Sequence, residues 1–395
     1  MERAWDIVVI GAGSAGVAAV EGARRQNADA RILLLDEDQE APYKRTQLSK
    51  YLASGFEPGQ FSLRDRDCFA DGSVEIRTGK TVTSVDREQK TLTLSAGEDV
   101  SYGTLVLATG SVPMYPRVVR PHEVGSFFVL RTLEDARRLI DGLARAKTVL
   151  VDGMGVLALE VTDQLIQMQK KPTLVGATAQ LMPRQLTTRA AELMEEELVR
   201  NKVKLMFQDE ILSFEDNGKG ALDVAMLKGS GAFDAVVFCI GVRPRTDLAA
   251  GCGLKVDRGI CVNERLQSSD PAVFVAGDCA QHPDGYVSYL WHAAEYQGWI
   301  AGENAAGGNA VFDRQAFRLK SSIFDTFVFS MNMPRETQGY RIEEVEVDNV
   351  YQAFFFTDEG LDGVVVLNDE PRSEQYNQAV VEHWSVDRVA DELML

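Results

Sequence analysis

A short glycine-rich segment directly after the first apolar run constrains the fold of this chain more than any other feature. Ile7–Ile10 is apolar, and Gly11–Gly16 follows it with the spacing G-x-G-x-x-G. In such a segment the first glycine permits a tight turn, the second lets the backbone approach a pyrophosphate, and the third lets a helix pack closely on a strand. A second apolar run, Ile32–Leu35, ends at Asp36, twenty positions after Gly16. This order predicts a βαβ unit that binds a dinucleotide, with the carboxylate accepting hydrogen bonds from an adenosine ribose.

The same order of features returns later in the chain. Thr148–Val151 is apolar, Gly153 and Gly155 begin a segment with the accepted variant spacing G-x-G-x-x-A, and Thr173–Val175 is the next apolar run. The two residues after Val175 are glycine and alanine, so this strand ends without a carboxylate for a ribose 2′-hydroxyl and without an arginine for a 2′-phosphate. The second unit indicates a nicotinamide dinucleotide domain and leaves NADH and NADPH open. A decayed or weak site is the alternative.

Length and charge narrow the class of protein. The 395 residues favour two or three domains, and a formal charge of −18, from 41 basic and 59 acidic residues, argues against a nucleic-acid partner. No apolar run approaches the ~18–20 residues that a membrane span needs, and we expect neither a leader nor a membrane segment. The five cysteines are widely spaced and no metal-binding His or Cys pattern occurs. We therefore expect free thiols in a cytoplasmic protein without a metal site.

An ordered set of further motifs resembles one family of flavoproteins. Pro42–Lys50 resembles the P-Y-x-R-x-x-L-S-K segment of FAD-dependent NAD(P)H oxidoreductases, which include rubredoxin reductases, putidaredoxin-type ferredoxin reductases and the flavoprotein part of nitrite reductase large subunits. The family's other motifs are matched, in chain order, by Ala108-Thr109-Gly110, Leu130–Ala136, Ile240–Pro244 and Gly277–Ala280. The resemblance runs from residue 6 to about 308. The tail, with Gly363–Asp369, looks more like the nitrite reductase and rubredoxin reductase branch.

The resemblance implies an α/β fold with two Rossmann-like dinucleotide-binding domains, as in glutathione reductase, and a small α+β C-terminal domain. We expect an FAD-binding domain over 1–112 and 243–312, an NAD(P)H-binding domain over 113–242, and a C-terminal domain over 313–395. The tail reads as a mostly antiparallel sheet with strands at 324–329, 340–347, 350–356 and 361–367, followed by one or two helices within 375–395.

The family pattern also implies which residues contact the cofactors. It assigns FAD contacts to Ala15, Asp36, Arg45, Lys50, Val82, Arg131, Asp278 and Trp291. Asp278 would accept from the ribityl or nearby hydroxyls, and the helix that begins near Trp291 would point its positive end at the pyrimidine side of the flavin. The expected cofactor-binding set is completed by Gly11, Gly13, Ser14, Gly16, Glu37, Ala108, Thr109, Gly110, Gly153, Gly155, Gly241, Gly277 and His292. For His292 a structural role is the alternative.

Lys50 and Glu160 form the candidate catalytic pair. The resemblance implies a salt bridge between them beside the flavin N5, under the incoming nicotinamide. Glu160 stands seven residues after Gly153, on the first helix of the second unit, where it should face the domain interface. A buried pair of this kind would hold position and tune the local potential. An ordinary surface ion pair is the alternative.

The cysteine pattern departs from that of the disulfide reductases in the same superfamily. Those enzymes place a CxxxxC pair on an early helix of the FAD domain, and related peroxidases and oxidases keep one cysteine there. Residues 39–55 contain none; Cys68 lies beyond, and Cys279 reads as a packing residue. We therefore expect no cysteine-based redox centre.

The resulting functional hypothesis is an oxidoreductase that takes a hydride from NAD(P)H to FAD and passes electrons to a small carrier such as rubredoxin or ferredoxin. The alternatives are an oxidase with oxygen as acceptor and a flavin-holding subunit without turnover. The chain is expected to be a monomer or homodimer. Residues 313–395 carry 17 acidic and 7 basic residues, and this charge would repel an acidic rubredoxin that approached the tail.

Overall fold

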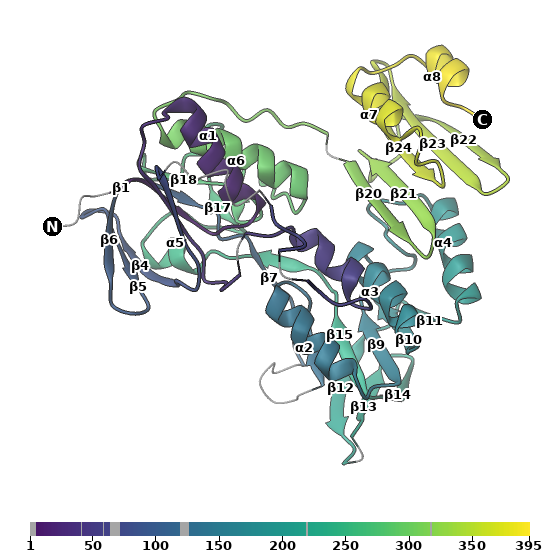
Figure 1. Ribbon diagram of the computed structural model, residues 1–395. Coiled ribbons are helices and arrows are strands. Elements are labelled where there is room, and N and C mark those ends of the chain that lie inside the picture. Colours follow the sequence, from purple (N-terminus) through teal and green to yellow (C-terminus); the bar gives the residue numbers. More distant parts are fainter. Residues whose placement is uncertain are drawn as a thin grey trace.

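The computed structural model describes residues 5–40, 42–57, 59–63, 72–118, 126–218, 220–316 and 318–395. Three larger sheets organise this part of the chain, and each is covered by its own helices (Figure 1). Two of these sheets contain parallel strands followed by a glycine turn and a helix, as the two glycine-rich segments predict.

The first sheet is built from both ends of the predicted FAD domain. The strand order is β3-β2-β1-β6-β5-β4, and β18 pairs with the C-terminal part of β6, at Leu105–Leu107. Strands β1, β2, β3, β6 and β18 run parallel, whereas β4 and β5 form an antiparallel extension of β6. The bounds are β1 Trp5–Ile10, β2 Ile32–Leu35, β3 Val74–Arg77, β4 Val82–Asp86, β5 Thr91–Leu94, β6 Asp99–Leu107 and β18 Val273–Val275.

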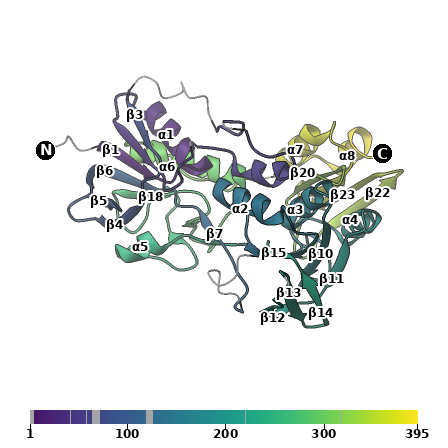
Figure 2. The ribbon, with the colours of Figure 1, turned by 60° about the horizontal axis from the view of Figure 1, so that its bottom comes forward.

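Two helices far apart in the sequence lie side by side on this sheet, namely α1 (Ser14–Gln26) and α6 (Trp291–Ala305) (Figures 1 and 2). Glycines allow the close approach. A Cβ atom on Gly302 would lie 1.9 Å from the carbonyl oxygen of Ala19, and one on Gly298 would lie 2.2 Å from that of Ala15. The two backbones are in contact at these glycines, so α6 is held against α1, the first helix of the chain.

The second sheet has the order β11-β10-β9-β15-β8 and is parallel throughout. Successive side chains of β9 point to opposite faces of this sheet. Val149 and Val151 pack against helices α2, α3 and α4, whereas Leu150 packs against a three-stranded antiparallel meander on the other face. The bounds are β8 Phe127–Phe128, α2 Leu133–Leu143, β9 Thr148–Asp152, α3 Val156–Gln167, β10 Lys171–Gly176, α4 Thr188–Arg200, β11 Lys204–Phe207, β12 Ile211–Asp216, β13 Leu222–Met226, β14 Gly229–Phe233 and β15 Ala235–Phe238.

A two-stranded antiparallel ribbon carries the chain between the two sheets. Strand β7 (Ser111–Pro113) leaves the first unit and β16 (Val242–Pro244) returns to it, with Pro113 opposite Val242. Short elements complete the first unit: the 3₁₀ helix η1 (Arg45–Tyr51), α5 (Asp247–Gly251), β17 (Ile260–Cys261) and β19 (Ala280–Gln281).

The C-terminal sheet, β20-β21-β24-β23-β22, is antiparallel, and its three central strands are buried on both faces. On β23, Tyr351 and Phe355 join a core shared with α3 and α4, whereas Phe354 faces α7 and α8. Double burial explains why its central strands are continuously apolar. The bounds are β20 Arg318–Ile323, β21 Thr326–Met331, β22 Arg341–Val347, β23 Val350–Thr357, β24 Gly360–Leu367, α7 Ser373–Val381 and α8 Val386–Glu392.

The tail prediction is confirmed for its four strands and its helices, and it missed β20. The sequence of β20, RLKSSI, is largely polar, because its Lys320 and Ser322 side chains are exposed at the sheet's edge. In the described part of the chain, no helix combines the length and apolarity that crossing a bilayer requires.

Candidate functional site

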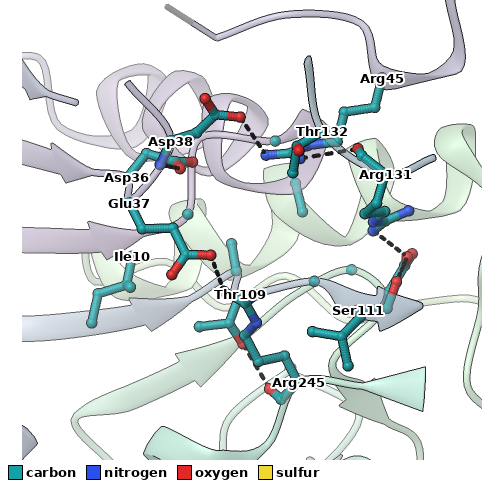
Figure 3. Close-up of a pocket in the computed structure, with 18 of the residues that line it drawn as sticks. Ile10, Asp36, Glu37, Asp38, Arg45, Thr109, Ser111, Arg131, Thr132 and Arg245 are labelled. Atoms are coloured by element: carbon teal, nitrogen blue, oxygen red, sulfur yellow. Dashed lines mark hydrogen bonds and ion pairs between the residues drawn. The ribbon is translucent and has the colours of Figure 1, made fainter. Parts of the chain in front are cut away.

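A cavity of about 970 Å³ opens along the carboxyl edge of the first sheet. Its walls are formed by the residues that directly follow β1, β2, β6 and β18, by residues of β4, and by the start of α6 (Figure 3). The carboxyl edge of a parallel sheet is where dinucleotides bind in folds of this type. Of the residues expected from the sequence, the lining contains Gly11, Gly13, Ser14, Ala15, Asp36, Glu37, Arg45, Val82, Ala108, Thr109, Gly110, Arg131, Gly277, Asp278 and Trp291.

The glycine turn before α1 has the geometry that its spacing predicts. Gly11 has a φ of +104°, and a Cβ there would lie 2.2 Å from the carbonyl oxygen of Ala108. Gly13 has no heavy atom of the described chain within 4 Å of its Cβ position, so this backbone faces open space. Gly16 does not line the cavity; a Cβ there would lie 1.7 Å from the Gly11 carbonyl oxygen. The first and third glycines close the turn, and the second leaves room for a ligand.

Asp36 stands at the end of β2 as a buried carboxylate. It accepts hydrogen bonds from the backbone N–H of Ala12 and, at 2.7 Å, from that of Asp38. Burial raises the pKa of Asp36, and these two N–H groups and Arg45 oppose the rise. Each bonded oxygen retains a second lone pair, so the group can still accept from a hydroxyl in the cavity.

At another part of the cavity, Asp278 is held by two donors on the same oxygen. Its Oδ2 accepts from the Ser111 hydroxyl at 2.7 Å and from Arg131 Nη2 at 3.0 Å. Among the described residues, no hydrogen bond reaches Oδ1. The backbone of the preceding residue, Gly277, is also held, because its N–H donates to Oε1 of the fully buried Gln297 at 2.8 Å. One carboxylate oxygen is therefore fixed while the other can serve a ligand.

Basic side chains face the acidic ones across the cavity (Figure 3). Arg45 Nη2 lies 3.7 Å from Asp38 Oδ2, and Arg45 Nη1 donates to the Arg131 carbonyl at 3.3 Å. Arg245, from the segment after β16, forms an ion pair with Glu37. The N-terminus of α1, Arg45 and Arg131 supply this lining with donors of the kind that bind a pyrophosphate.

His292 and Trp291 are neighbours on α6 with different surroundings. Trp291 lines the cavity and begins the helix, so the helix's free N–H groups face the cavity as expected. His292, expected to contact the cofactor, is exposed and is not part of the lining. Successive side chains on a helix point about 100° apart, so only one of the two can face the cavity.

The structure does not pair Lys50 with Glu160, the two residues expected to form a salt bridge. The Glu160 carboxylate accepts from the Ser49 hydroxyl at 2.6 Å and from the Ser321 hydroxyl at 2.5 Å. Lys50 is exposed, and among the described residues no ion pair joins it to Glu160. The physical reason is that η1 turns the buried Ser49 toward α3 and leaves Lys50 outside, while β20 supplies the second hydroxyl. Neither Lys50 nor Glu160 lines the cavity.

The second glycine turn repeats the geometry of the first. Gly153 has a φ of +138°, and its Cβ would lie 2.5 Å from the Cys239 carbonyl oxygen. Gly155 has no heavy atom of the described chain within 4 Å of its Cβ position, and Gly241 has a φ of +112°. None of the three lines the large cavity, which belongs to the first sheet. Gly153 and Gly155 form a separate glycine turn between β9 and α3, at the edge of the second sheet.

A search for known relatives matches residues 5–298 to the family described as pyridine nucleotide-disulphide oxidoreductase. The chain belongs to this family. The match confirms the resemblance drawn from the motifs, and with it the two Rossmann-like domains.

The pyridine nucleotide-disulphide oxidoreductases most similar to the chain include electron-transfer proteins. Putidaredoxin reductase CamA of Pseudomonas putida is 32% identical over 303 residues, which cover 75% of this chain and 69% of that protein. Nitrite reductase [NAD(P)H] of Bacillus subtilis is 26% identical over 371 residues, 92% of this chain, and the chain spans only 45% of its length.

Solved structures agree with this assignment over nearly the whole chain. The covalent putidaredoxin reductase–putidaredoxin complex superposes with a TM-score of 0.87 at 26% identity, covering 99% of this chain and 97% of that one. A ferredoxin reductase from Rhodopseudomonas palustris gives a TM-score of 0.83 at 26% identity, covering 92% of this chain and 91% of that one.

The disulphide chemistry in the family's name has no counterpart among the described cysteines. Cys239, Cys252, Cys261 and Cys279 are free thiols, and burial raises the pKa of Cys239 and of Cys279. Cys68 lies outside the described residues. In the described ranges, no group of three or more His, Cys, Asp or Glu is placed to hold a metal ion.

Two groups of residues were missed by the sequence reasoning. Ser111 and Arg245 line the cavity, but a lone serine or arginine in a linking strand carries no signal of its own. Asp152 did carry a signal, because an acid closes an otherwise apolar strand directly before Gly153. It is 8% exposed, and burial, with the nearby charge of Glu210, raises its pKa to about 7.

Proposed function

We propose that this chain is an FAD-dependent oxidoreductase that takes a hydride from NAD(P)H and passes the electrons to a small redox protein such as a rubredoxin or a ferredoxin. The cavity of the first sheet carries this proposal, because it combines a glycine turn, two arginines and two differently held carboxylates in one site. We also propose the division into an FAD-binding domain (1–112 and 243–312), an NAD(P)H-binding domain (113–242) and a C-terminal domain (313–395).

The residues of the cavity fit FAD in chemistry. Asp36 would accept from the adenosine ribose, and the α1 N-terminus with Arg45 and Arg131 would hold the pyrophosphate. Asp278 Oδ1 would accept from a ribityl hydroxyl, and the N-terminus of α6 at Trp291 would stabilise negative charge on the flavin. When bound, FAD supplies the step from a two-electron donor to a one-electron acceptor.

Glu160 is proposed as a positioning residue. Its carboxylate joins Ser49 of the first unit to Ser321 of the C-terminal sheet, and it stands on the helix that follows the second glycine turn. It would fix the orientation of the nicotinamide-binding unit toward the flavin site, where alignment within fractions of an ångström controls the rate. Lys50, exposed beside Ser49, is proposed to meet the incoming dinucleotide directly.

Relatives support the acceptor class. The matched proteins include putidaredoxin reductase and, at 28% identity over 277 residues, the rubredoxin-NAD(+) reductase of Pseudomonas putida. Free thiols in the described part and the absence of a cysteine pair in residues 39–55 support a cytoplasmic protein that passes electrons from the flavin without a thiol relay.

Anaerobic titration of the FAD-loaded protein with NADH and with NADPH tests the first half of this function. Bleaching of the oxidised flavin band by at least one of them is expected, and a flavin that stays oxidised with both contradicts it. In the Lys50→Met variant the bleaching should slow at subsaturating dinucleotide; an unchanged rate removes the role given to Lys50.

The acceptor is tested by turnover. Reduction of a rubredoxin or a ferredoxin should proceed well above the rate of hydrogen peroxide formation in air. Rapid oxygen consumption with neither carrier reduced identifies an oxidase instead. Failure to reduce even ferricyanide identifies a flavin-holding subunit.

A further inference from the structure

The two glycine turns can be aligned residue by residue, because the strand registers are the same. β1 pairs with β2 through Ile10 and Leu35, and β9 pairs with β10 through Asp152 and Val175. The turn that follows is also closed in the same way: the N–H of Gly11 donates to Leu35 at 2.7 Å, and that of Gly153 donates to Val175 at 2.8 Å. The equivalent positions are Ile10 and Asp152, Leu35 and Val175, and Asp36 and Gly176.

This alignment shows that the carboxylate has changed strands between the two sites. In the first site the apolar Ile10 ends β1 and the acid Asp36 follows β2, and both line the cavity. In the second site the acid, Asp152, ends β9 and a glycine stands at the position of Asp36.

Gly176 cannot regain an acid without disturbing its surroundings. A Cβ at this position would lie 2.7 Å from Cγ of the buried Met154 side chain, which fills the space where the acid of the first site stands. The end of β10 is therefore closed to a carboxylate. Asp152, on the adjacent strand, is a buried carboxylate at the same edge, paired in register with Val175.

Asp152 has no partner within the described chain. It is 8% exposed, and no described residue donates a hydrogen bond to its carboxylate. A carboxyl with this little exposure and no donor among the described residues keeps its acceptor oxygens available for a ligand hydroxyl. The position equivalent to it, Ile10, lines the cavity of the first site, so the Asp152 side chain lies where a dinucleotide in the second site would pass.

Three other charged groups belong to the same edge. Glu210, exposed in the loop after β11, lies close enough to raise the pKa of Asp152. Asp209 is buried and bonded through Oδ1 to the N–H groups of Glu210 and Lys228, and its own N–H donates to the Gly176 carbonyl at 3.1 Å. Lys228 directs its ammonium to the Phe207 carbonyl at 2.9 Å, at the end of β11.

We propose that Asp152 is the residue that makes the second dinucleotide site prefer NADH over NADPH. This inference rests on the proposed function, in that it assumes a nicotinamide dinucleotide at the second turn. An ionised carboxylate accepts a hydrogen bond from the adenosine ribose with its free hydroxyls, whereas it repels a 2′-phosphate that carries two negative charges. Glu210 adds to this repulsion.

The preference should depend on pH. The pKa of Asp152 is about 7, so the carboxyl is largely protonated at pH 6 and largely ionised at pH 8. Repulsion of the 2′-phosphate should therefore grow over this interval. Glu210→Gln removes one of the two causes that raise this pKa, so it should shift the midpoint of the change to lower pH.

Equilibrium binding of two ligands without nicotinamide provides the test. ADP-ribose and 2′-phospho-ADP-ribose are titrated calorimetrically into the FAD-loaded protein at pH 6 and pH 8. The measured quantity is the dissociation constant of 2′-phospho-ADP-ribose divided by that of ADP-ribose. In the unmodified chain, this ratio should rise about tenfold from pH 6 to pH 8, a change of about 1.4 kcal/mol. Because the 2′-phosphate itself titrates at about pH 6, Asp152→Asn serves as the reference: its ratio should change less with pH than that of the unmodified chain, and should be about tenfold lower at pH 8.

Two further variants serve as controls. Glu215→Gln removes an exposed carboxylate of β12, away from the edge, and should leave the ratio unchanged. Lys228→Gln tests the lysine whose ammonium bonds the Phe207 carbonyl at the end of β11; if it, and not Asp152→Asn, changes the ratio, the inference is overturned.

The remaining outcomes are also decisive. A ratio that has the same value and the same change with pH in the unmodified chain and in Asp152→Asn overturns the inference while leaving the proposed function intact. Binding of neither ligand overturns both, because the second site is then not a nucleotide site. Normal ligand discrimination without flavin reduction by either NADH or NADPH overturns the proposed function alone.

Discussion

Asp278 owes its orientation to donors that use only one of its two oxygens. Ser111 comes from β7 and Arg131 from the segment before α2, so two different parts of the chain fix one carboxylate. The free Oδ1 is thereby presented to the cavity without the entropic cost of ordering the side chain on binding.

Replacing Asp278 with alanine should weaken FAD binding by about 10–100-fold, because a charged acceptor is lost and Arg131 is left unpaired. Fluorescence titration of the apoprotein with FAD measures this. Asp313→Ala, an exposed acid outside the cavity, is the matched control and should bind FAD as the unmodified chain does. Equal affinities in the two variants would contradict the role of Asp278.

Asp152 makes folding stability depend on pH. Burial raises its pKa from 3.8 to about 7, so between these values the folded chain keeps a proton that the unfolded chain has released. Its contribution to stability is therefore largest below pH 4 and declines as the pH rises to about 7.

Asp152→Asn should remove this loss, raising the free energy of unfolding at pH 8 by roughly 2–4 kcal/mol while changing little at pH 4. Thermal unfolding at several pH values, with Glu215→Gln alongside, provides the measurement. Parallel curves for the unmodified chain and Asp152→Asn across this range are the result that would refute it.

The sequence reveals residue roles when one residue type alone can perform them. The turn at Gly11 and the open backbone at Gly13 were predictable, because close approach and a positive φ leave glycine as the residue that fits. The hydrogen bond from Ser321 to Glu160 could not be predicted, because Ser321 lies 161 positions further along the chain and a serine fits many environments. Lys50 and Glu160 have opposite charges, yet the fold brings hydroxyls to the carboxylate instead.

At the scale of elements, the contact between α1 and α6 depends on glycines, which have no side chain to keep the helices apart. The two helices approach until the backbone of one meets the glycines of the other, at Gly22, Gly298 and Gly302. This contact aligns the N-termini of both helices with the same cavity.

Gly302→Ala should destabilise the protein by about 3 kcal/mol or more, because its Cβ would lie 1.9 Å from the Ala19 carbonyl oxygen and the helices would have to separate. Gly251→Ala, at the end of α5 with no described atom within 4 Å, should change stability by less than about 1 kcal/mol. Urea unfolding compares the two variants, and similar midpoints would exclude the packing argument.

Helices and strands were predictable from the sequence where their burial fixes the pattern of apolar residues along the chain. The continuous apolar runs of β1, β9 and β24 reflect sheets covered on both faces, and each was expected at nearly its observed place. Strand β20 was missed because its alternate residues are polar, and its place in the sheet is decided by hydrogen bonds to β21, a contact that no local pattern records.

For the whole molecule, one carboxylate joins three separate parts. Glu160 on α3 of the second unit bonds Ser49 of the first and Ser321 of the C-terminal sheet, and both serines are buried (Figure 2 shows the three parts meeting near α3 and β20). Relative placement of the parts therefore depends on a polar contact as well as on the shared apolar core.

Ser321→Ala should lower stability by about 1–2 kcal/mol and increase hydrogen exchange along β20, because it removes one donor from a carboxylate at a buried junction. Ser322→Ala, on the exposed side of the same strand, is the control and should change neither quantity. Loss of the same free energy in both variants would show that the strand, and not the contact with Glu160, is sensitive.

The ribbon of β7 and β16 has a consequence for engineering. Because Pro113 and Val242 face each other in its register, the chain leaves the first unit and re-enters it at adjacent points. The intervening segment is thus a cassette with neighbouring ends. It could be cut out and replaced by a short hairpin turn, or exchanged for the corresponding cassette of a relative, without lengthening any connection in the remaining protein.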